Sequence, residues 1–193
     1  MRIVGGMWRG KTFDAPEGRG TRPTTDRMRE ALASMILSAM GLNLEGCSVL
    51  DAFAGSGAVG LELLSRGARR CTFCERDRRA SALVRRNCKA LGVPSAAFDV
   101  VGGDVCRLPQ RAPRQGVPYD IVFLDPPYAM PAKDVSSLVA GLDAAHMLAA
   151  SCLVVYERSS DGAKLELEGF EELRSKRHGG TCIDLLQKER SDE

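Results

Sequence analysis

Short apolar runs alternate with longer amphipathic segments along most of the chain. Runs rich in Val, Leu, Ile and Phe, such as Ile121-Val122-Phe123-Leu124, are typical of buried strands. Apolar residues that recur three and four positions apart are typical of helices that pack one face on a core. The apolar runs predict strands at residues 48–53, 71–75, 98–101, 119–124 and 152–157. The amphipathic segments predict helices near residues 25–40, 58–67, 77–91 and 135–142.

The order of these elements defines the expected fold class. Alternating strands and helices predict an α/β fold, in which a doubly wound, mostly parallel sheet carries helices on both faces. Two further strands, at 170–176 and 181–187, flank Gly179-Gly180 and predict a closing hairpin that adds an antiparallel edge. The 193 residues fit one domain, expected at 25–187 and followed by a flexible tail at 188–193.

Residues 1–24 differ in character from the rest of the chain. Short pieces, many glycines and many arginines make up this segment, and its own apolar content is low. Ile3-Val4 and Lys11-Thr12-Phe13 predict a small hairpin around the intervening glycines. We therefore expect residues 1–24 to form a basic appendage that contributes little to the core.

Composition and charge narrow the classes of function. No run of eighteen apolar residues occurs, so no transmembrane helix is expected. The opening residues lack the apolar stretch of a signal peptide, which favours a cytoplasmic location. Residues 1–133 hold 20 basic and 13 acidic residues, whereas residues 134–193 hold 7 basic and 12 acidic. A basic front suits a polyanionic partner, although such an imbalance also arises by chance in enzymes.

The seven cysteines form no disulfide framework and fit reduced thiols in a cytosolic protein. Cys71 and Cys74 have CxxC spacing, but they lie in a predicted strand. Positions three apart on a strand point to opposite faces, so the two thiols are not expected to bind one metal ion. No second cysteine pair or histidine cluster completes a zinc site, and no metal is expected.

Asp125-Pro126-Pro127-Tyr128 follows the apolar run that ends at Leu124. Two prolines end the strand and stiffen the loop, which holds an acid and an aromatic ring where ligands bind in open α/β sheets. The Asp125 carboxylate and the Pro126 carbonyl can each accept an N–H of an exocyclic amine, while Tyr128 stacks on the base. The same residues also fit an ordinary strand-ending turn with a solvated acid.

Acidic residues also lie near the ends of three other predicted strands. Asp51 precedes a Gly55-x-Gly57 turn, where glycines let a ligand approach the backbone. An acid there disfavours a pyrophosphate and favours a cationic cofactor. Glu75 is placed to accept from ribose hydroxyls and Asp104 from an adenine amine. Each acid alone fits an exposed helix cap, but together with Asp125 they predict one ligand-binding rim.

With these residues in place, the chain resembles a seven-stranded S-adenosylmethionine-dependent methyltransferase. More narrowly, it resembles the ribosomal small subunit methyltransferase D family, which methylates the N2 amine of a guanine in 16S ribosomal RNA. The segments that carry this resemblance are Arg2-Ile3-Val4-Gly5-Gly6-x-Trp8-Arg9-Gly10, Thr21-Arg22-Pro23-Thr24-Thr25-Asp26-Arg27-x-Arg29-Glu30, Asp51-x-Phe53-Ala54-Gly55-Ser56-Gly57-Ala58-x-Gly60-Leu61-Glu62 and Asp125-Pro126-Pro127-Tyr128. Cys74 departs from the family pattern, where an aliphatic residue is more usual.

The resemblance implies S-adenosylmethionine as cofactor and 16S ribosomal RNA, within a small-subunit assembly particle, as partner. The residues expected to hold the cofactor are Asp51, Phe53, Gly55, Gly57, Glu75, Arg76, Asp104 and Val105. Those expected to hold the target guanine are Asp125, Pro126, Pro127 and Tyr128. The basic N-terminal segment would face the RNA, with phosphate contacts from Arg2, Arg9, Arg22 and Arg27.

Other functions are weighed against this one. An enzyme that methylates adenine N6 or cytosine N4 shares the Asp-Pro-Pro-Tyr motif, but in DNA such enzymes usually carry a sizeable target-recognition region, which this chain has no insertion to supply. A C5-cytosine methyltransferase needs a nucleophilic cysteine, typically after proline, and no Pro-Cys pair occurs. A non-catalytic RNA-binding module with the same fold remains a further alternative, against which the complete set of acids argues.

Overall fold

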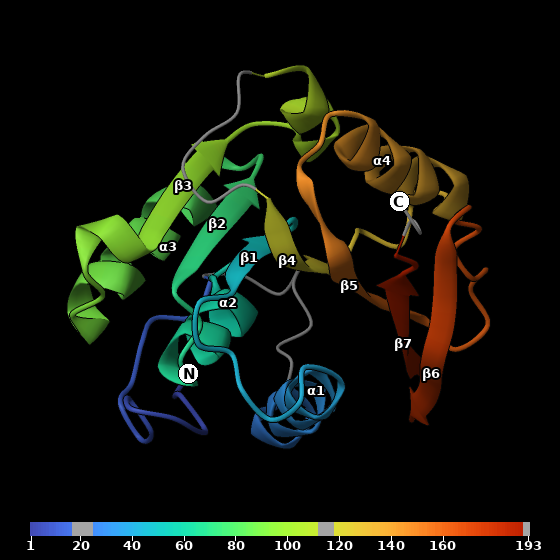
Figure 1. Cartoon of the computed structure of the whole chain (residues 1–193). Helices are drawn as coiled ribbons and strands as arrows, with labels where there is room; N and C mark the ends of the chain where they lie inside the picture. The colour runs from blue at the N-terminus through green and yellow to red at the C-terminus, as the bar shows by residue number, and fades with distance from the viewer. Residues whose placement is uncertain (17–24, 112–117, 191–193) are drawn as a thin grey trace.

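The computed structural model describes residues 1–16, 25–111 and 118–190, which form one mixed seven-stranded sheet with helices on both faces (Figure 1). The strands are β1 (Ser48–Asp51), β2 (Arg70–Glu75), β3 (Phe98–Gly102), β4 (Tyr119–Leu124), β5 (Leu148–Ser159), β6 (Phe170–His178) and β7 (Thr181–Lys188). The helices are α1 (Asp26–Ala39), α2 (Ala58–Ser65), α3 (Arg78–Leu91) and α4 (Ala132–Ala144), with 3₁₀ turns at Ser95–Ala97 and Val105–Gln110.

The sheet has the order β3-β2-β1-β4-β5-β7-β6. Strands β1 to β5 pair in parallel, and β7 runs antiparallel to both β5 and β6. The predicted α/β fold class and the antiparallel C-terminal hairpin are confirmed. The hairpin is inserted so that its second strand, β7, pairs with β5, and its first strand, β6, forms the edge.

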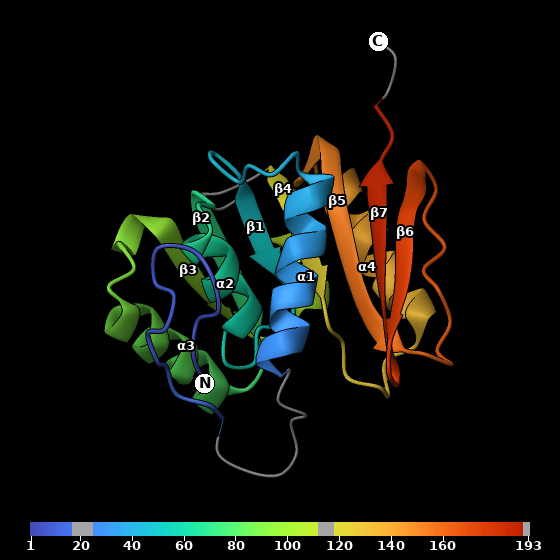
Figure 2. The ribbon, with the colours of Figure 1, turned by 90° about the horizontal axis from the view of Figure 1, so that it is seen from below.

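Two apolar layers flank the sheet. Helices α1, α2 and α3 pack on one face, and α4 packs on the other, so that α1 lies in front of the strands and α4 behind them in Figure 2. Cys71 belongs to the first layer and Cys74 to the second, as the alternation of side chains along a strand requires. The two thiols of the CxxC motif therefore lie on opposite faces of the sheet and cannot bind one metal ion together.

The ends of the helices follow from local capping. Thr25 accepts a hydrogen bond from the Met28 backbone N–H (3.2 Å) and begins α1, and Asp77 accepts from Ala80 N–H (2.8 Å) and begins α3. Gly92 ends α3 in the left-handed conformation (φ 76°), which a residue with a side chain rarely adopts.

The described part of the N-terminal segment belongs to the core. The predicted hairpin is present as a bridge between Arg2 and Thr12, but Ile3, Trp8 and Phe13 are buried in the same apolar layer as α1, α2 and α3. The expectation that residues 1–24 contribute little to the core is therefore wrong for these three side chains.

Helix α2 provides the polar groups that hold this segment. Glu62 accepts from Val4 N–H (2.9 Å), and the Ser65 hydroxyl accepts from Trp8 N–H (2.9 Å) while donating to the Gly5 carbonyl (2.6 Å). A Cβ at Gly6, where φ is 75°, would lie 1.9 Å from the Ser65 carbonyl oxygen. Glycine is required there because the two backbones are in direct contact.

The C-terminal boundary also differs from the prediction. Lys188 was expected to begin a flexible tail, but it is the last residue of β7, and its ammonium group donates to Asp143 near the end of α4. Glu189 then donates its backbone N–H to the Gly169 carbonyl (2.9 Å). Residues 191–193 lie outside the described part of the chain.

Candidate active site

A cavity of about 1760 Å³ lies at the carboxyl ends of the parallel strands. Strands β1 and β4 are adjacent there, although β2 and β3 extend to one side of β1 and β5 to the other side of β4. This reversal of strand order is the position where open α/β sheets bind ligands. The volume exceeds the range of roughly 300–1,000 Å³ typical of drug-sized ligands, so a nucleoside cofactor and a nucleobase can both be accommodated.

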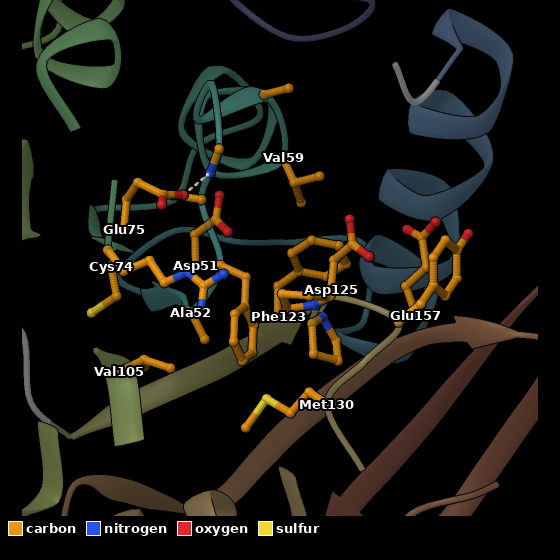
Figure 3. Close-up of a pocket in the computed structure, with 18 of the residues that line it drawn as sticks. Asp51, Ala52, Val59, Cys74, Glu75, Val105, Phe123, Asp125, Met130 and Glu157 are labelled. Atoms are coloured by element: carbon orange, nitrogen blue, oxygen red, sulfur yellow. Dashed lines mark hydrogen bonds between the residues drawn. The ribbon is translucent and has the colours of Figure 1, made fainter. Parts of the chain in front are cut away.

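Nearly all the residues predicted for cofactor and base binding line this one cavity (Figure 3). They are Asp51, Phe53, Gly55, Glu75, Arg76, Asp104, Val105, Asp125, Pro126, Pro127 and Tyr128. Segments separated by more than seventy residues in sequence are thus brought to one surface by the parallel strands. Gly57 is the predicted cofactor residue that does not line the cavity.

Gly57 lies where the strand-to-helix turn packs on the sheet. It precedes α2 with a φ of 80°, and a Cβ there would lie 3.2 Å from Val84 and 3.3 Å from the Phe73 ring. The residue therefore allows the strand-to-helix turn to pack on the sheet. A Cβ at Gly55, by contrast, would meet no atom within 4 Å, so this part of the turn leaves room beside its backbone for a ligand.

Asp51, the last residue of β1, is the most buried acid of the site, with 1% of its surface exposed. Its carboxylate accepts from the Gly60 backbone N–H (3.1 Å) at the start of α2. Burial raises the pKa of Asp51 to about 7; the Gly60 hydrogen bond opposes this, and the charges of Asp125 and Glu75 raise the pKa further. A cation bound next to Asp51 would reverse this penalty, which fits a ligand that carries a positive charge.

Glu75, at the end of β2, is held in place by the backbone. One carboxylate oxygen accepts from Gly55 N–H (2.8 Å) and the other from Asp77 N–H (2.8 Å). Each oxygen retains a further lone pair that can accept from a ligand hydroxyl. The glycine turn and the acid therefore fix one another, and both line the cavity.

Asp104 follows β3 and begins the 3₁₀ turn at Val105–Gln110. Its side chain accepts from the Cys106 backbone N–H (3.0 Å), so the alternative of an exposed capping acid describes one of its roles. Asp104 nevertheless lines the cavity, as do Arg76 and the buried Val105. Asp104 can accept a hydrogen bond from the edge of an aromatic ring, and the apolar Val105 beside it can pack on the face of that ring.

The Asp125-to-Tyr128 loop continues directly from β4. Removal of the Asp125 carboxyl group from water by the cavity walls raises its pKa to about 6, although the residue is accessible from the cavity. The Pro127 carbonyl accepts from Met130 N–H (2.8 Å) and closes the loop. Tyr128 has 74% of its surface exposed. A large apolar ring left this open is available to stack on a base.

Several cavity residues were not predicted. Met28 and Ala31 of α1, Glu157 of β5, and Lys176 and His178 of β6 contribute to its walls. Glu157 had a signal in the sequence, because it ends the apolar run 152–157 as Asp51 and Glu75 end theirs. The residues of α1 and β6 had none, since their approach depends on how a helix and an edge strand pack around the sheet.

The four arginines predicted to contact RNA have different surroundings. Arg9 and Arg27 are exposed, and Arg27 lines the cavity. Arg2 forms an ion pair with Asp26 (2.6 Å), which also binds the buried Arg29 (2.6 Å). The hydrogen bond from Arg2 lowers the pKa of Asp26 most, desolvation opposes it, and the hydrogen bond from Arg29 lowers the pKa further. Arg22 lies outside the described residues.

Within residues 1–16, 25–111 and 118–190, no cluster of three or more His, Cys, Asp or Glu side chains is arranged to hold a metal ion. None of the helices in these ranges is both long enough and apolar enough to span a bilayer.

The sheet order and the position of the cavity define a class. Magnesium protoporphyrin IX methyltransferase from Synechocystis PCC 6803, solved with bound S-adenosylmethionine, superimposes with a TM-score of 0.61 at 19% identity, covering 90% of this chain and 87% of that one. The fold is that of the S-adenosylmethionine-dependent methyltransferases, as the sequence predicted.

The family is defined by closer matches. The model of the family described as conserved hypothetical protein 95 matches residues 1–187, so the chain belongs to that family. Ribosomal RNA small subunit methyltransferase D of Haemophilus influenzae is 30% identical over 190 residues, which are 97% of this chain and 93% of the relative. The solved yhhF protein of Escherichia coli is 28% identical with a TM-score of 0.80, covering 99% of both chains. The resemblance predicted from the motifs is confirmed.

Proposed function

We propose that this protein transfers a methyl group from S-adenosylmethionine to the exocyclic N2 amine of a guanine in 16S ribosomal RNA. The observation that carries the proposal is the placement of Asp125-Pro126-Pro127-Tyr128 on the wall of the same cavity as Asp51, Glu75 and Asp104. The name of the Haemophilus influenzae relative supports the ribosomal RNA as substrate.

The residues of the β1, β2 and β3 ends fit the cofactor. When bound, S-adenosylmethionine supplies an electrophilic methyl group on a positively charged sulfur. Glu75 accepts from the ribose hydroxyls, and Asp104 accepts from the adenine amine while Val105 and Phe53 contact the ring. The buried Asp51 carboxylate favours the positive charge of the ligand, and Arg76 closes the same wall.

The loop after β4 binds and orients the guanine. The exocyclic nitrogen is a poor nucleophile because its lone pair is conjugated with the ring. Asp125 and the Pro126 carbonyl each accept one N–H, which favours a pyramidal nitrogen whose lone pair is directed out of the ring plane. Pro127 restricts the loop, and the exposed Tyr128 ring stacks on the base and fixes its angle.

Asp125 orients the amine and does not deprotonate it in advance. A carboxylate with a pKa of about 6 is far too weak a base to remove a proton from a neutral aromatic amine. The proton leaves after the nitrogen begins to bond to the methyl carbon and gains positive charge. Asp125 stabilises that charge and then accepts the proton, which passes to solvent through the open cavity.

The RNA-facing surface and the division of the chain remain parts of the proposal. In this division, residues 25–187 carry the acids and the Asp125-to-Tyr128 loop of the cavity, to which Met1, Ala15 and Pro16 also contribute. Residues 1–24 are assigned to face the RNA, in the cytoplasm and within a small-subunit assembly particle. Arg9 and Arg27 contact phosphates through exposed side chains. Arg2 and Arg22 are assigned the same role, and Arg2 retains its ion pair with Asp26.

The decisive experiment identifies the methylated nucleoside. Ribosomal RNA and small-subunit particles from cells that lack this protein are incubated with the purified protein and radiolabelled S-adenosylmethionine, then digested to nucleosides and separated. We expect label in N2-methylguanosine. Label in N6-methyladenosine or N4-methylcytidine would show that another exocyclic amine is the target, and absence of label in any RNA would refute the proposal.

Two substitutions test the assigned roles by single-turnover methyl transfer at saturating cofactor. Asp125→Asn retains the shape but loses the charge, so we expect the rate to fall by ~10²–10³. Tyr128→Phe retains the stacking face and should be close to the parent, whereas Tyr128→Ala should lose roughly 1–3 kcal/mol of base stacking. A parental rate for Asp125→Asn, or equal damage from both Tyr128 changes, would contradict these roles.

A further inference from the structure

Glu157 lies beside Asp125 on the neighbouring strand. Strands β4 and β5 are parallel, with Phe123 opposite Val155 and Leu124 opposite Tyr156. The next pair in this register is Asp125 and Glu157. Since adjacent strands are ~4.8 Å apart, the two acids start from neighbouring backbone positions.

The two side chains also share a face of the sheet. Phe123 and Val155, two positions earlier on each strand, belong to the same apolar layer, and side chains two apart on a strand point the same way. Asp125 and Glu157 both line the main cavity and a smaller adjoining one of about 390 Å³. Figure 3 shows both carboxyl groups directed to the same side of the strands.

Strand β5 gives Glu157 a fixed backbone. It pairs with β4 on one side and with β7 on the other, where Glu157 is opposite Ile183. The residue is thus more restrained than the loop that carries Asp125. Two carboxyl groups on neighbouring strands of one cavity wall suit a ligand that offers two adjacent N–H donors.

Guanine differs from the other amine-bearing bases in what stands next to its amine. Its N2 amine is adjacent to N1–H, so two neighbouring groups of the Watson–Crick edge are donors. Adenine and cytosine instead present a ring nitrogen that accepts hydrogen bonds beside their amine. Two adjacent carboxylates accept from the guanine edge, whereas the second carboxylate would repel the ring-nitrogen lone pair of adenine or cytosine.

We propose that Glu157 accepts the N1–H of the target guanine while Asp125 accepts from its N2 amine, and that Glu157 thereby selects guanine over adenine and cytosine. The inference rests on the proposed function, because it assigns the base specificity of that same site. Glu157 is a specificity-determining residue in direct contact with the base, and methyl transfer itself depends on Asp125.

The test compares guanine with 2-aminopurine at the methylated nucleotide. The analogue retains the amine, but its N1 carries no hydrogen and accepts hydrogen bonds. Ligated 16S ribosomal RNA with either base, supplied bare or in small-subunit particles according to which the parent methylates, is assayed in single turnover. A lost hydrogen bond to a charged acceptor corresponds to about 10- to 100-fold. We expect the parent protein to prefer guanine by that factor.

The variants separate the contact from other effects of the analogue. Glu157→Ala should lose about 10- to 100-fold of the parent's preference for guanine, and Glu157→Gln should gain on 2-aminopurine, because its amide can donate to N1. The analogue also lacks the guanine O6, but that loss is the same in every variant and cancels when the guanine-to-2-aminopurine ratio of a variant is divided by that of the parent. Glu168→Ala, an exposed acid in the β5–β6 connection, should retain the parental ratio.

An unchanged guanine preference in Glu157→Ala and Glu157→Gln, with S-adenosylmethionine still bound, would overturn the assignment of Glu157. Equal rates on the two bases in the parent would overturn it as well. Failure of the proposed function has a different signature, namely that the parent forms no N2-methylguanosine on the guanine substrate.

Discussion

The buried carboxyl group of Asp51 should make cofactor binding release protons and depend on pH. Its pKa of about 7 in the free protein reflects burial, with Asp125 and Glu75 adding to the shift. Binding of a cationic cofactor favours the ionised form, so complex formation should release the proton that Asp51 carries. At pH 6 most Asp51 side chains are protonated, so a large part of one proton should be released from Asp51 per cofactor bound, and Asp125, with a pKa of about 6, can add to it.

The affinity should follow the ionised fraction. With a pKa of about 7, that fraction is about 3% at pH 5.5 and about half at pH 7, so S-adenosylmethionine should bind about fifteenfold tighter at pH 7. Both values lie below the reference pKa of an α-amino group, about 7.7–8.0, so the cofactor amine changes little over this range. Titration calorimetry in two buffers of different ionisation enthalpy measures the released proton directly.

Asp51→Asn supplies the control. The amide is nearly isosteric and cannot titrate, so proton release should fall to the part that Asp125 contributes, and the pH dependence of binding should become weaker. The contribution of Asp51 to the stability of the free protein should fall as the pH rises, whereas cofactor affinity should rise. Because the folded pKa is raised above the usual value, the Asp51 contribution is most favourable at low pH and is lost as the pH rises towards 7. Free Asp51→Asn should therefore melt higher than the parent at pH 8. Cofactor binding without proton release in the parent would refute this reasoning.

Three further outcomes follow from the geometry. Glu75→Ala should weaken cofactor binding in calorimetry by on the order of 1.5–3 kcal/mol for each ribose hydrogen bond lost, and parental affinity would show that the ribose lies elsewhere. Neutralising Arg9 and Arg27 together should reduce the salt dependence of RNA binding by roughly 0.7–0.9 in slope per phosphate contact, with cofactor affinity unchanged; the exposed Arg69, at the amino end of β2, is the control whose loss should leave the slope as it was. Gly60→Ala places a Cβ 2.3 Å from a ring carbon of Phe73 in β2, so the free energy of unfolding should fall by about 1–3 kcal/mol in chemical denaturation. An unchanged midpoint would contradict the close packing.

The sequence predicted the elements that depend on local patterns. Apolar runs bounded by glycine, proline or acids defined the strands, and the acids at four strand ends reached one cavity because parallel strands all end on the same side of the sheet. The same rule would have found Glu157, which was already predicted to end a strand. Its partnership with Asp125 required the order of β4 and β5, which no local pattern contains.

The burial of the N-terminal segment, which the sequence did not predict, depends on tertiary contacts. Ile3, Trp8 and Phe13 are separated by glycines and polar residues, so they looked too sparse to form a core. They are buried because α2 presents Glu62 and Ser65 to the backbone of the segment. A tertiary contact between residues sixty apart thus decides whether this stretch is an appendage or part of the core, and composition alone cannot reveal it.

The insertion of β7 between β5 and β6 has a consequence for synthesis of the chain. The ribosome produces β6 before β7. Among the described strands β6 pairs with β7 alone, so β6 cannot join the sheet until β7 has been made. A chain interrupted before Thr181 would lack both outer strands and leave the long edge of β5 unpaired. Unpaired edges of this kind associate with other chains. The side of the cavity that holds Glu157 is therefore the last to form and the first to be lost when synthesis is cut short.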